Sequence, residues 1–403
     1  MRSKPVALLL LALAELCAMA LWFSASAVLP QLTAEWELSG ALQAWFTMSV
    51  QVGFVAGALV SALANLADRV SAQRLVAGCT LVGLLANAAI TQVGAPGPAL
   101  ALRFLTGFCL AGVYPPGMKL VATWCREDRG LGIGLLVGAL TVGSALPHLL
   151  NAIDWGSGAA GLPPWRWVLG AASASAAAGV GLVLLVPTGP HHVPARSFDW
   201  RQAGAALASP GVRLANLGYL GHMWELYAMW AWTPLMLLAS YEQAGYSPRA
   251  ARLAGFLVVA AGGAGSVLAG RVADRWGRTT VTVASLVVSG SCALVAGQLF
   301  TAPVALTALC LVWGFAVVAD SAQFSAAVSE LSDPQYVGTA LTVQTSLGFL
   351  LTLLTLWAIP PLRARWGWPV ACAALAAGPV VGIWAMLRLR RSPEATRLAS
   401  GNR

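Results

Sequence analysis

This chain of 403 residues has few charged side chains. Asp, Glu, Lys and Arg together make up 10% of it, and lysine occurs only at Lys4 and Lys119. Average soluble domains carry about 25% charged residues. The scarcity of charge, with a hydrophobic fraction of 58% and a mean hydropathy of +0.73, excludes an ordinary soluble protein. It predicts that the solvent of this chain is lipid.

The sequence also lacks the usual signatures of cofactor chemistry. Its seven cysteines lie in apolar stretches or at their edges without a CxxC spacing, so they predict neither a disulfide framework nor a metal site. The adjacent His191 and His192 would face different ways on any regular element, and no third ligand is near them. No phosphate-binding glycine loop occurs. We therefore expect no metal, no nucleotide, no other cofactor and no enzymatic activity.

Apolar stretches of about 20 residues, the length that a helix needs to cross a bilayer, are abundant. The predicted spans are residues 6–29, 41–64, 75–93, 99–124, 130–153, 167–187, 212–240, 251–270, 279–300, 304–331, 339–360 and 369–387. The first stretch also resembles a signal peptide, but it is longer than usual for one, and its Glu15 motif recurs inside the chain at Glu225. The sequence thus predicts an all-α membrane protein with about twelve transmembrane helices.

The basic residues between these spans gather on one side of the predicted membrane. Arginines occur at residues 69–74, 126–129, 196–201 and 271–278 and in the tail at 388–397, whereas the opposite loops carry Glu35, Glu37 and Glu242. This distribution follows the positive-inside rule and predicts that both termini are cytoplasmic. It also accounts for the net charge of +9 without nucleic acid.

Two sequence motifs occur twice. Glu-Leu-x-Ala-Met begins at Glu15 and again at Glu225, and an Asp-Arg pair follows the second and the eighth spans. Both pairs of motifs run in the same direction, which predicts two parallel repeats with a site between them near the bilayer midplane. We expect an N-terminal six-helix bundle at 1–187, a cytoplasmic linker at 188–208, and a C-terminal six-helix bundle with a short basic tail at 209–403.

The segment 270–278, Gly-Arg-Val-Ala-Asp-Arg-Trp-Gly-Arg, resembles the signature between helices 8 and 9 of the major facilitator superfamily. Segment 64–74 resembles the copy between helices 2 and 3, but it has lost both glycines. The resemblance implies that superfamily's fold of two six-helix bundles. It also implies gating roles for Asp68, Arg69, Gly270, Asp274, Arg275, Gly277 and Arg278.

The fourth span resembles the superfamily pattern of an arginine, here Arg103, followed by small residues at every fourth position. In the family, an arginine at that place is linked to coupling or substrate binding. The paired Pro115 and Pro116 should distort this helix, and the glycines of the fifth span predict close helix packing. The chain is also loosely similar to bacterial nitrate, nitrite and cyanate permeases, although stretch 41–64 lacks the arginine of nitrate porters.

Ionisable side chains inside a membrane are costly unless paired or hydrated, so each one is a functional candidate. Two predicted helix faces combine them with sulfur and indole groups: Glu15, Met19, Trp22 and Ser26 on the first span, and His222, Glu225, Met229 and Trp232 on the seventh. We assign proton coupling to Glu15, Glu225 and Asp320. We assign substrate binding to Arg103, Lys119, Tyr114, Trp22, His222, Met229, Trp232 and Gln323. Packing of the Met and Trp residues, and snorkelling of Arg103 and Lys119, are the alternative roles.

The predicted function is secondary active transport by proton-coupled alternating access. Arg103 and Lys119 favour a small anion or organic acid as the substrate. Efflux of an amphipathic or cationic compound is the main alternative, and a membrane sensor that does not transport is a third hypothesis. We expect a small-molecule substrate, protons and the lipid bilayer as partners, no nucleic acid, and a working monomer in a bacterial cytoplasmic membrane.

Overall fold

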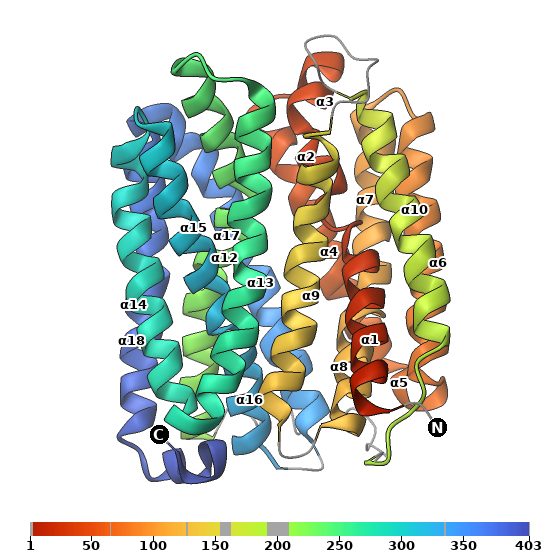
Figure 1. The fold of residues 1–403 in the computed structure, drawn as a ribbon, viewed down its shortest axis with the longest axis vertical. Coiled ribbons are helices and arrows are strands. Elements are labelled where there is room, and N and C mark those ends of the chain that lie inside the picture. The colour runs from red at the N-terminus through yellow and green to blue at the C-terminus, as the bar shows by residue number, and fades with distance from the viewer. Residues whose placement is uncertain are drawn as a thin grey trace.

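The computed structural model describes residues 3–64, 66–125, 128–153, 163–191, 209–333 and 336–402, and within these ranges it contains helices but no strand. The helices form two bundles side by side, with the first half of the chain on the right of Figure 1 and the second half on the left. Both ends of the chain lie at the same end of the molecule (Figure 1), which we call the cytoplasmic end from its arginines. The predicted two-bundle membrane fold is confirmed.

The N-terminal bundle contains ten α-helices and one short 3₁₀ helix within the described residues. They are α1 (Lys4–Met19), α2 (Ser24–Ala27), α3 (Leu29–Trp36), α4 (Gly40–Leu63), α5 (Leu66–Arg69), α6 (Ala72–Ala89), η1 (Ile90–Gln92), α7 (Pro96–Leu110), α8 (Tyr114–Trp124), α9 (Arg129–Leu150) and α10 (Trp165–Leu184). The predicted linker begins after this bundle, and its residues 192–208 lie outside the described residues.

The C-terminal bundle starts with one long helix and ends with a short tail. Its elements are α12 (Pro210–Gln243), α13 (Pro248–Trp276), α14 (Arg278–Ala296), η3 (Gly297–Leu299), α15 (Pro303–Ala319), α16 (Ser321–Leu331), α17 (Val337–Ala373), η4 (Ala374–Ala376), α18 (Ala377–Arg390) and η5 (Pro393–Gly401). The element α17 holds a sharp bend at Gly367, whose φ of 74° lies in the left-handed region that glycine tolerates. This bend separates the last two predicted spans.

Nine helices of the described chain are long and apolar enough to cross a membrane, and the longest, at 337–390, contains two spans. The first and the seventh predicted spans complete the set of twelve. The first contains only a short helix, because α1 ends after 16 residues, and the seventh, α12, carries His222, Glu225 and several indole groups in its middle. The two spans with the repeated acid are thus the ones least typical of a plain lipid-facing helix.

Three spans predicted as continuous helices are broken. The breaks lie at residues 20–23 between α1 and α2, at 111–113 between α7 and α8, and at Asp320 between α15 and α16. The second break agrees with the expected distortion, because Pro115 and Pro116 stand in the first turn of α8, where proline needs no amide donor. The first break contains no proline, and its cause lies in another helix, as described below.

The two bundles meet along α9 with α13 and along α4 with α17. The contact of α9 with α13 depends on glycine: a Cβ added at Gly134 would lie 2.8 Å from the Ser266 carbonyl oxygen, and one at Gly138 would lie 2.9 Å from the Gly263 oxygen. Small residues let the backbones approach this closely. The predicted close packing of the fifth span is therefore confirmed, and it joins the two halves of the molecule.

Candidate functional site

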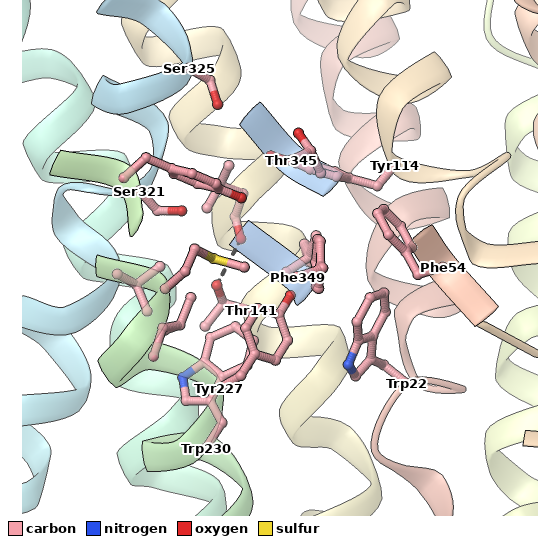
Figure 2. A pocket seen from close by; sticks show the side chains of 16 residues that line it. Trp22, Phe54, Tyr114, Thr141, Tyr227, Trp230, Ser321, Ser325, Thr345 and Phe349 are labelled. Carbon is pink, nitrogen blue, oxygen red and sulfur yellow. Dashed lines mark hydrogen bonds between the residues drawn. The ribbon is translucent and has the colours of Figure 1, made fainter. Parts of the chain in front are cut away.

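A pocket lies between the two bundles, with about 560 Å³ of empty space, its open end included. Its walls come from α4, α8, α9 and the first helix break on one side and from α12, α15, α16 and α17 on the other (Figure 2). The lining residues are Trp22, Phe54, Tyr114, Val137, Leu140, Thr141, Tyr219, Met223, Leu226, Tyr227, Trp230, Val318, Ser321, Ser325, Thr345 and Phe349.

The two ends of this pocket differ in chemistry. Toward the cytoplasmic ends of α8 and α16, hydroxyl-bearing side chains are partly exposed, namely those of Tyr114, Ser321, Ser325 and Thr345. At the opposite end the aromatic side chains are buried, with Trp230 1% and Trp22 2% exposed. No Asp, Glu, Lys, Arg or His is among the described lining residues. The site therefore offers hydroxyl groups and aromatic rings and no fixed charge.

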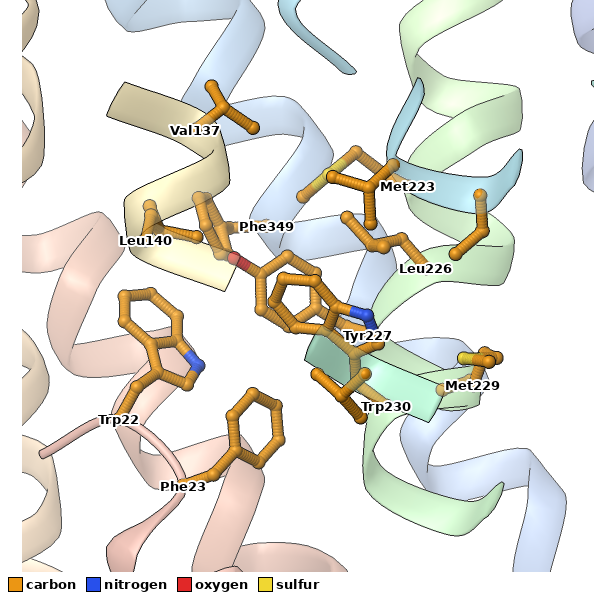
Figure 3. Packing of buried hydrophobic residues seen from close by; sticks show 14 of the residues in the cluster. Trp22, Phe23, Val137, Leu140, Met223, Leu226, Tyr227, Met229, Trp230 and Phe349 are labelled. Carbon is orange, nitrogen blue, oxygen red and sulfur yellow. The ribbon is translucent and has the colours of Figure 1, made fainter. Parts of the chain in front are cut away.

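The buried end is an aromatic cluster that both bundles build (Figure 3). The Trp22 ring lies 5.2 Å from the Phe54 ring, 5.7 Å from the Tyr227 ring and 5.4 Å from the Phe349 ring, measured between centroids. Phe54 and Phe349 are 4.5 Å apart across the contact of α4 with α17. Such ring pairs contribute about 0.5–1.5 kcal/mol each beyond their buried area. The rings at this end of the pocket therefore belong to both halves of the molecule.

Arg103 does not reach the pocket with its guanidinium, contrary to the predicted substrate contact. The side chain is fully buried, and its donors bind the first helix break: Nη1 donates to the Leu21 carbonyl at 2.9 Å and to Ser24 Oγ at 3.1 Å, and Nη2 donates to the Trp22 carbonyl. Its Nε donates to the Phe46 carbonyl of α4 at 3.3 Å. Carbonyls at a helix end need donors inside a membrane, and Arg103 supplies them.

Other residues predicted to bind substrate are divided between the pocket and its surroundings. Trp22 and Tyr114 line the pocket. Lys119 is half-buried on α8 and is not a lining residue. Gln323 is fully buried and accepts a hydrogen bond from Arg278 Nη1 at 2.8 Å, which ties it to the cytoplasmic end rather than to the pocket.

The predicted face of α12 also differs from the face that lines the pocket. The lining residues Tyr219, Met223, Tyr227 and Trp230 recur with helical spacing, but His222, Glu225, Met229 and Trp232 point elsewhere. Trp232 borders a second, smaller cavity of about 220 Å³ within the C-terminal bundle. Because α12 carries large side chains on all faces, the periodicity of its sequence did not identify the face that lines the pocket, which only packing against the other bundle selects.

Glu225 lies at the centre of a polar cluster inside the C-terminal bundle. Its carboxyl group is fully buried and accepts hydrogen bonds from Ser289 Oγ of α14 at 2.8 Å and from Trp313 Nε1 of α15 at 2.7 Å. Both donors are uncharged, so hydrogen bonds rather than an adjacent cation offset the cost of burying this carboxyl group. Nothing in the sequence linked Trp313 to Glu225, because the two residues lie on different spans.

Asp320, at the break between α15 and α16, has a histidine as its nearest ionisable partner. His222 Nδ1 lies 2.9 Å from Asp320 Oδ1, and both side chains are 1% exposed. The two atoms are within ion-pair distance, but they do not meet the geometry of a hydrogen bond. His222 was predicted to bind substrate; the structure places it beside the Asp320 carboxylate and the Phe324 ring, whose centroid lies 5.5 Å away.

Glu15 has much simpler surroundings. It is 2% exposed, its Oε1 has no hydrogen-bond partner among the described residues, and its Oε2 lies close to Gly117 of α8, where an added Cβ would be 3.1 Å away. Both oxygens of Glu225 in the second copy of the motif therefore accept hydrogen bonds, whereas one oxygen of Glu15 in the first copy has no partner in the described part of the chain.

The predicted gating signature forms a network at the cytoplasmic end. Arg278 Nη1 donates to Asp274 Oδ1 at 2.9 Å, and its Nη2 donates to Glu330 Oε1 at 2.9 Å. A Cβ added at Gly130 would lie 2.4 Å from Asp274 Oδ1, so this carboxylate sits against the start of α9 in the other bundle. Gly277 turns the chain with a φ of 91°. Glu330 was not predicted, and the side chain of Asp68 lies outside the described part.

Two six-helix bundles with a pocket between them and acids buried beside it define a multi-pass membrane transporter. A sequence model of the Major Facilitator Superfamily matches residues 11–356. The chain belongs to this superfamily, and it is a transporter rather than an enzyme.

Solved structures of similar fold support the architecture. The proton:xylose symporter XylE bound to 6-bromo-6-deoxy-D-glucose matches with a TM-score of 0.74 at 15% identity, over 96% of this chain and 95% of that one. The xylose transporter XylE from E. coli, in a partially occluded inward-open conformation, matches with a TM-score of 0.74 at 15% identity, over 96% and 97%. A D-xylose-proton symporter matches with 0.73 at 16%, over 98% and 99%. No sequence among the curated proteins compared matches the chain, and the nitrate, nitrite and cyanate branch stays a prediction.

Proposed function

We propose that this chain is a proton-coupled transporter of a small, uncharged, hydroxyl-bearing solute such as a monosaccharide. The observation that carries the proposal is the pocket lining, which combines aromatic rings with hydroxyl groups and contains no charged side chain among the described residues. Sites of this kind bury the apolar face of a ligand against rings and orient it with a few polar groups. The similar structures of proton:xylose symporters support the same class of substrate.

The earlier hypotheses of an anion and of an amphipathic cation have less support from this pocket. An anion would need Arg103 or Lys119, but the Arg103 donors bind carbonyls around the first helix break, and Lys119 is not a lining residue. A cation would need an acid in the lining, but Glu15, Glu225 and Asp320 all lie outside it. A charged solute without a counter-charge would be expensive to hold here.

Proton coupling is assigned to the polar cluster of the C-terminal bundle. Glu225, Asp320 and His222 are buried behind the pocket face of α12. Glu225 adds a negative charge to this region when it releases a proton, and it removes that charge when it takes the proton up again. Tyr219, Met223 and Leu226 of the same helix line the pocket. Protonation can therefore influence the solute through the position of α12, without direct contact.

The proposed topology follows from these assignments. We assign residues 1–187 and 209–403 to the two rocking bundles and 188–208 to the linker between them, with the protein acting as a monomer in a bacterial cytoplasmic membrane. The direction is assigned as uptake with protons, by analogy with the symporters above. The contact of α9 with α13 and that of α4 with α17 are the surfaces along which the bundles would rock.

The proposal is tested by transport into proteoliposomes with an imposed pH gradient. Radiolabelled D-glucose, D-xylose, benzoate and tetraphenylphosphonium provide an uncharged pair, an anion and a cation. We expect accumulation of a sugar that requires an acidic exterior and is abolished by a protonophore. Accumulation of benzoate or of the cation without either sugar would contradict the proposed substrate class, and sugar uptake indifferent to the gradient would contradict the coupling.

A further inference from the structure

The indole of Trp22 carries a buried hydrogen-bond donor that no described residue accepts. Its Nε1 is inaccessible and unbonded, although buried N–H groups nearly always have an acceptor in folded proteins. In Figures 2 and 3 the nitrogen edge of this indole points into the pocket, toward Tyr227 of the other bundle. The donor therefore faces the rings that close the buried end of the pocket, among them that of Tyr227.

The backbone around this indole is held by the guanidinium group of Arg103. Trp22 lies in the break between α1 and α2, where the helix has released its carbonyls. Arg103 binds the carbonyls of Leu21 and Trp22 and, with Nε, the carbonyl of Phe46 in α4. The rigid fork of a guanidinium fixes several acceptors in one geometry, which an ammonium group does not. Arg103 thus sets the position of the backbone from which the indole extends.

Trp230 provides a natural comparison within the same pocket. Its Nε1 is also buried without an acceptor among the described residues, and its ring also lines the pocket. Its nitrogen edge, however, is turned away from Trp22 and toward the C-terminal bundle (Figures 2 and 3). The two tryptophans are therefore alike in burial and in ring area but differ in the direction of the donor.

We propose that Trp22 determines the specificity of this pocket by donating its indole N–H to an oxygen of the solute, and that Arg103 is the residue that positions it. The chemical class of ligand is a solute with a hydroxyl, ether or carbonyl oxygen beside an apolar face that packs on the rings of Phe54, Tyr227 and Phe349. The inference rests on the proposed function only in placing the transported solute in this pocket.

The first test compares Trp22→Phe with Trp230→Phe in proteoliposomes. The probes are D-glucose and its 2-deoxy, 3-deoxy and 6-deoxy derivatives, with benzoate as an anion and tetraphenylphosphonium as a cation without an acceptor oxygen. In the wild type, removal of the oxygen that accepts from Trp22 should raise the half-saturation concentration about tenfold. In Trp22→Phe, glucose and the deoxy derivative that lacks this oxygen should have equally high half-saturation concentrations, because neither can accept a hydrogen bond from residue 22. Trp230→Phe should keep the wild-type ratio.

The second test addresses the positioning role of Arg103. Arg103→Lys keeps the charge and loses the fork, so it should reduce the ratio between glucose and the same deoxy derivative as Trp22→Phe does. The double variant should show no further loss of this ratio, as expected for two residues that act through one contact. A merely structural role would lower the yield of folded protein and the maximum rate at an unchanged ratio, and that result would overturn the positioning role.

The outcomes separate this inference from the proposed function. Glucose uptake with full discrimination in Trp22→Phe overturns the inference and leaves the proposed function intact. Uptake of benzoate alone, weakened about tenfold in Trp22→Phe but not in Trp230→Phe, supports the Trp22 donor and overturns the uncharged substrate. Uptake of tetraphenylphosphonium alone overturns both, since that cation has no oxygen to accept the bond.

Discussion

The two halves of the molecule carry the same Glu-Leu-x-Ala-Met motif and use it differently. In the C-terminal half, α12 continues as a helix through the motif, and Glu225 receives hydrogen bonds from Ser289 and Trp313. In the N-terminal half, α1 ends at Met19, and Glu15 keeps one oxygen without a partner among the described residues. A repeated sequence motif therefore does not imply repeated chemistry, because the neighbours that complete each site come from other helices.

One pair of residues accounts for much of this difference. Trp313 follows Arg103 by 313 − 103 = 210 residues, the same offset as 225 − 15 = 210 between the two acids. In the first half this position holds a guanidinium that binds the carbonyls of a broken helix. In the second half it holds an indole that donates to the acid itself. The first half thus presents a tryptophan that lines the pocket, and the second half presents an acid with hydrogen-bonded oxygens.

Neutralising the two acids separately is the strongest test of this comparison. Glu225→Gln should lose pH-driven accumulation, with the ratio of internal to external solute falling to about one, as for a carrier without coupling. Exchange of labelled for unlabelled solute should persist, because the pocket lining is unchanged. Uptake against a gradient and counterflow in proteoliposomes measure the two properties.

The matched variant is Glu15→Gln, which removes the acid of the other copy. We expect it to retain accumulation driven by the pH gradient, since Glu15 lacks the donors that complete the second site. If Glu15→Gln loses coupling and Glu225→Gln keeps it, the functional asymmetry is the reverse of the one argued here.

The sequence alone predicted the elements whose cause is local. The twelve spans follow from runs of apolar residues, and the break before α8 follows from Pro115 and Pro116. The break after Met19 was not predicted, because it depends on Arg103 from a distant span. The pocket face of α12 was not predicted either, because its selection requires the other bundle. Trp22 and Tyr114, which were predicted to bind substrate, line the pocket, whereas the charges that suggested an anion serve elsewhere or lie outside the lining.

The next largest effect on transport is expected from the cytoplasmic network of Asp274, Arg278 and Glu330. Within the described residues, this network is formed by the second copy of the signature. Asp274→Asn should reduce turnover about tenfold, since loss of a charge-assisted hydrogen bond costs about 1.5–3 kcal/mol. The change removes the charge that faces Arg278 and the start of α9. Arg271→Gln, at an exposed position about one turn earlier on α13, is the control and should behave like the wild type. Equal turnover of Asp274→Asn and the wild type at matched protein levels would show that this loop has no gating role.

The contact of α9 with α13 should be sensitive to a single methyl group. Gly134→Ala places a Cβ 2.8 Å from the Ser266 carbonyl oxygen, so the helices must separate. Overpacking of this kind costs about 1–3 kcal/mol. We expect a lower melting temperature and slower transport. Gly170→Ala on α10 is the matched control, because nothing lies within 4 Å of the added atom, and a Gly134→Ala protein as stable as this control would contradict the tight contact.

The smallest expected effect concerns the ion pair that ties α1 to the start of α9. Lys4 Nζ lies 2.7 Å from both carboxylate oxygens of Asp128, and the side chains are 38% and 40% exposed. Partial burial is the largest single influence and opposes ionisation, but the hydrogen bond and charge of Lys4, together with smaller hydrogen bonds, outweigh it and lower the pKa of Asp128 below its usual value. Exposed pairs contribute about 0–1 kcal/mol, so Lys4→Ala should lower the melting temperature only slightly near neutral pH.

The pH dependence of that small effect distinguishes an ion pair from simple packing. Because the pKa of folded Asp128 is lowered, the pair contributes stability above the carboxyl's unfolded pKa of about 3.9, and the contribution is lost as the pH falls through the folded value. The difference in melting temperature between wild type and Lys4→Ala should therefore vanish in acid, and it should be absent at every pH in an Asp128→Asn background. A difference that persists in acid or in that background would assign the effect to the packing of the lysine stem on α1, and the pair would then contribute nothing to the contact between the two helices.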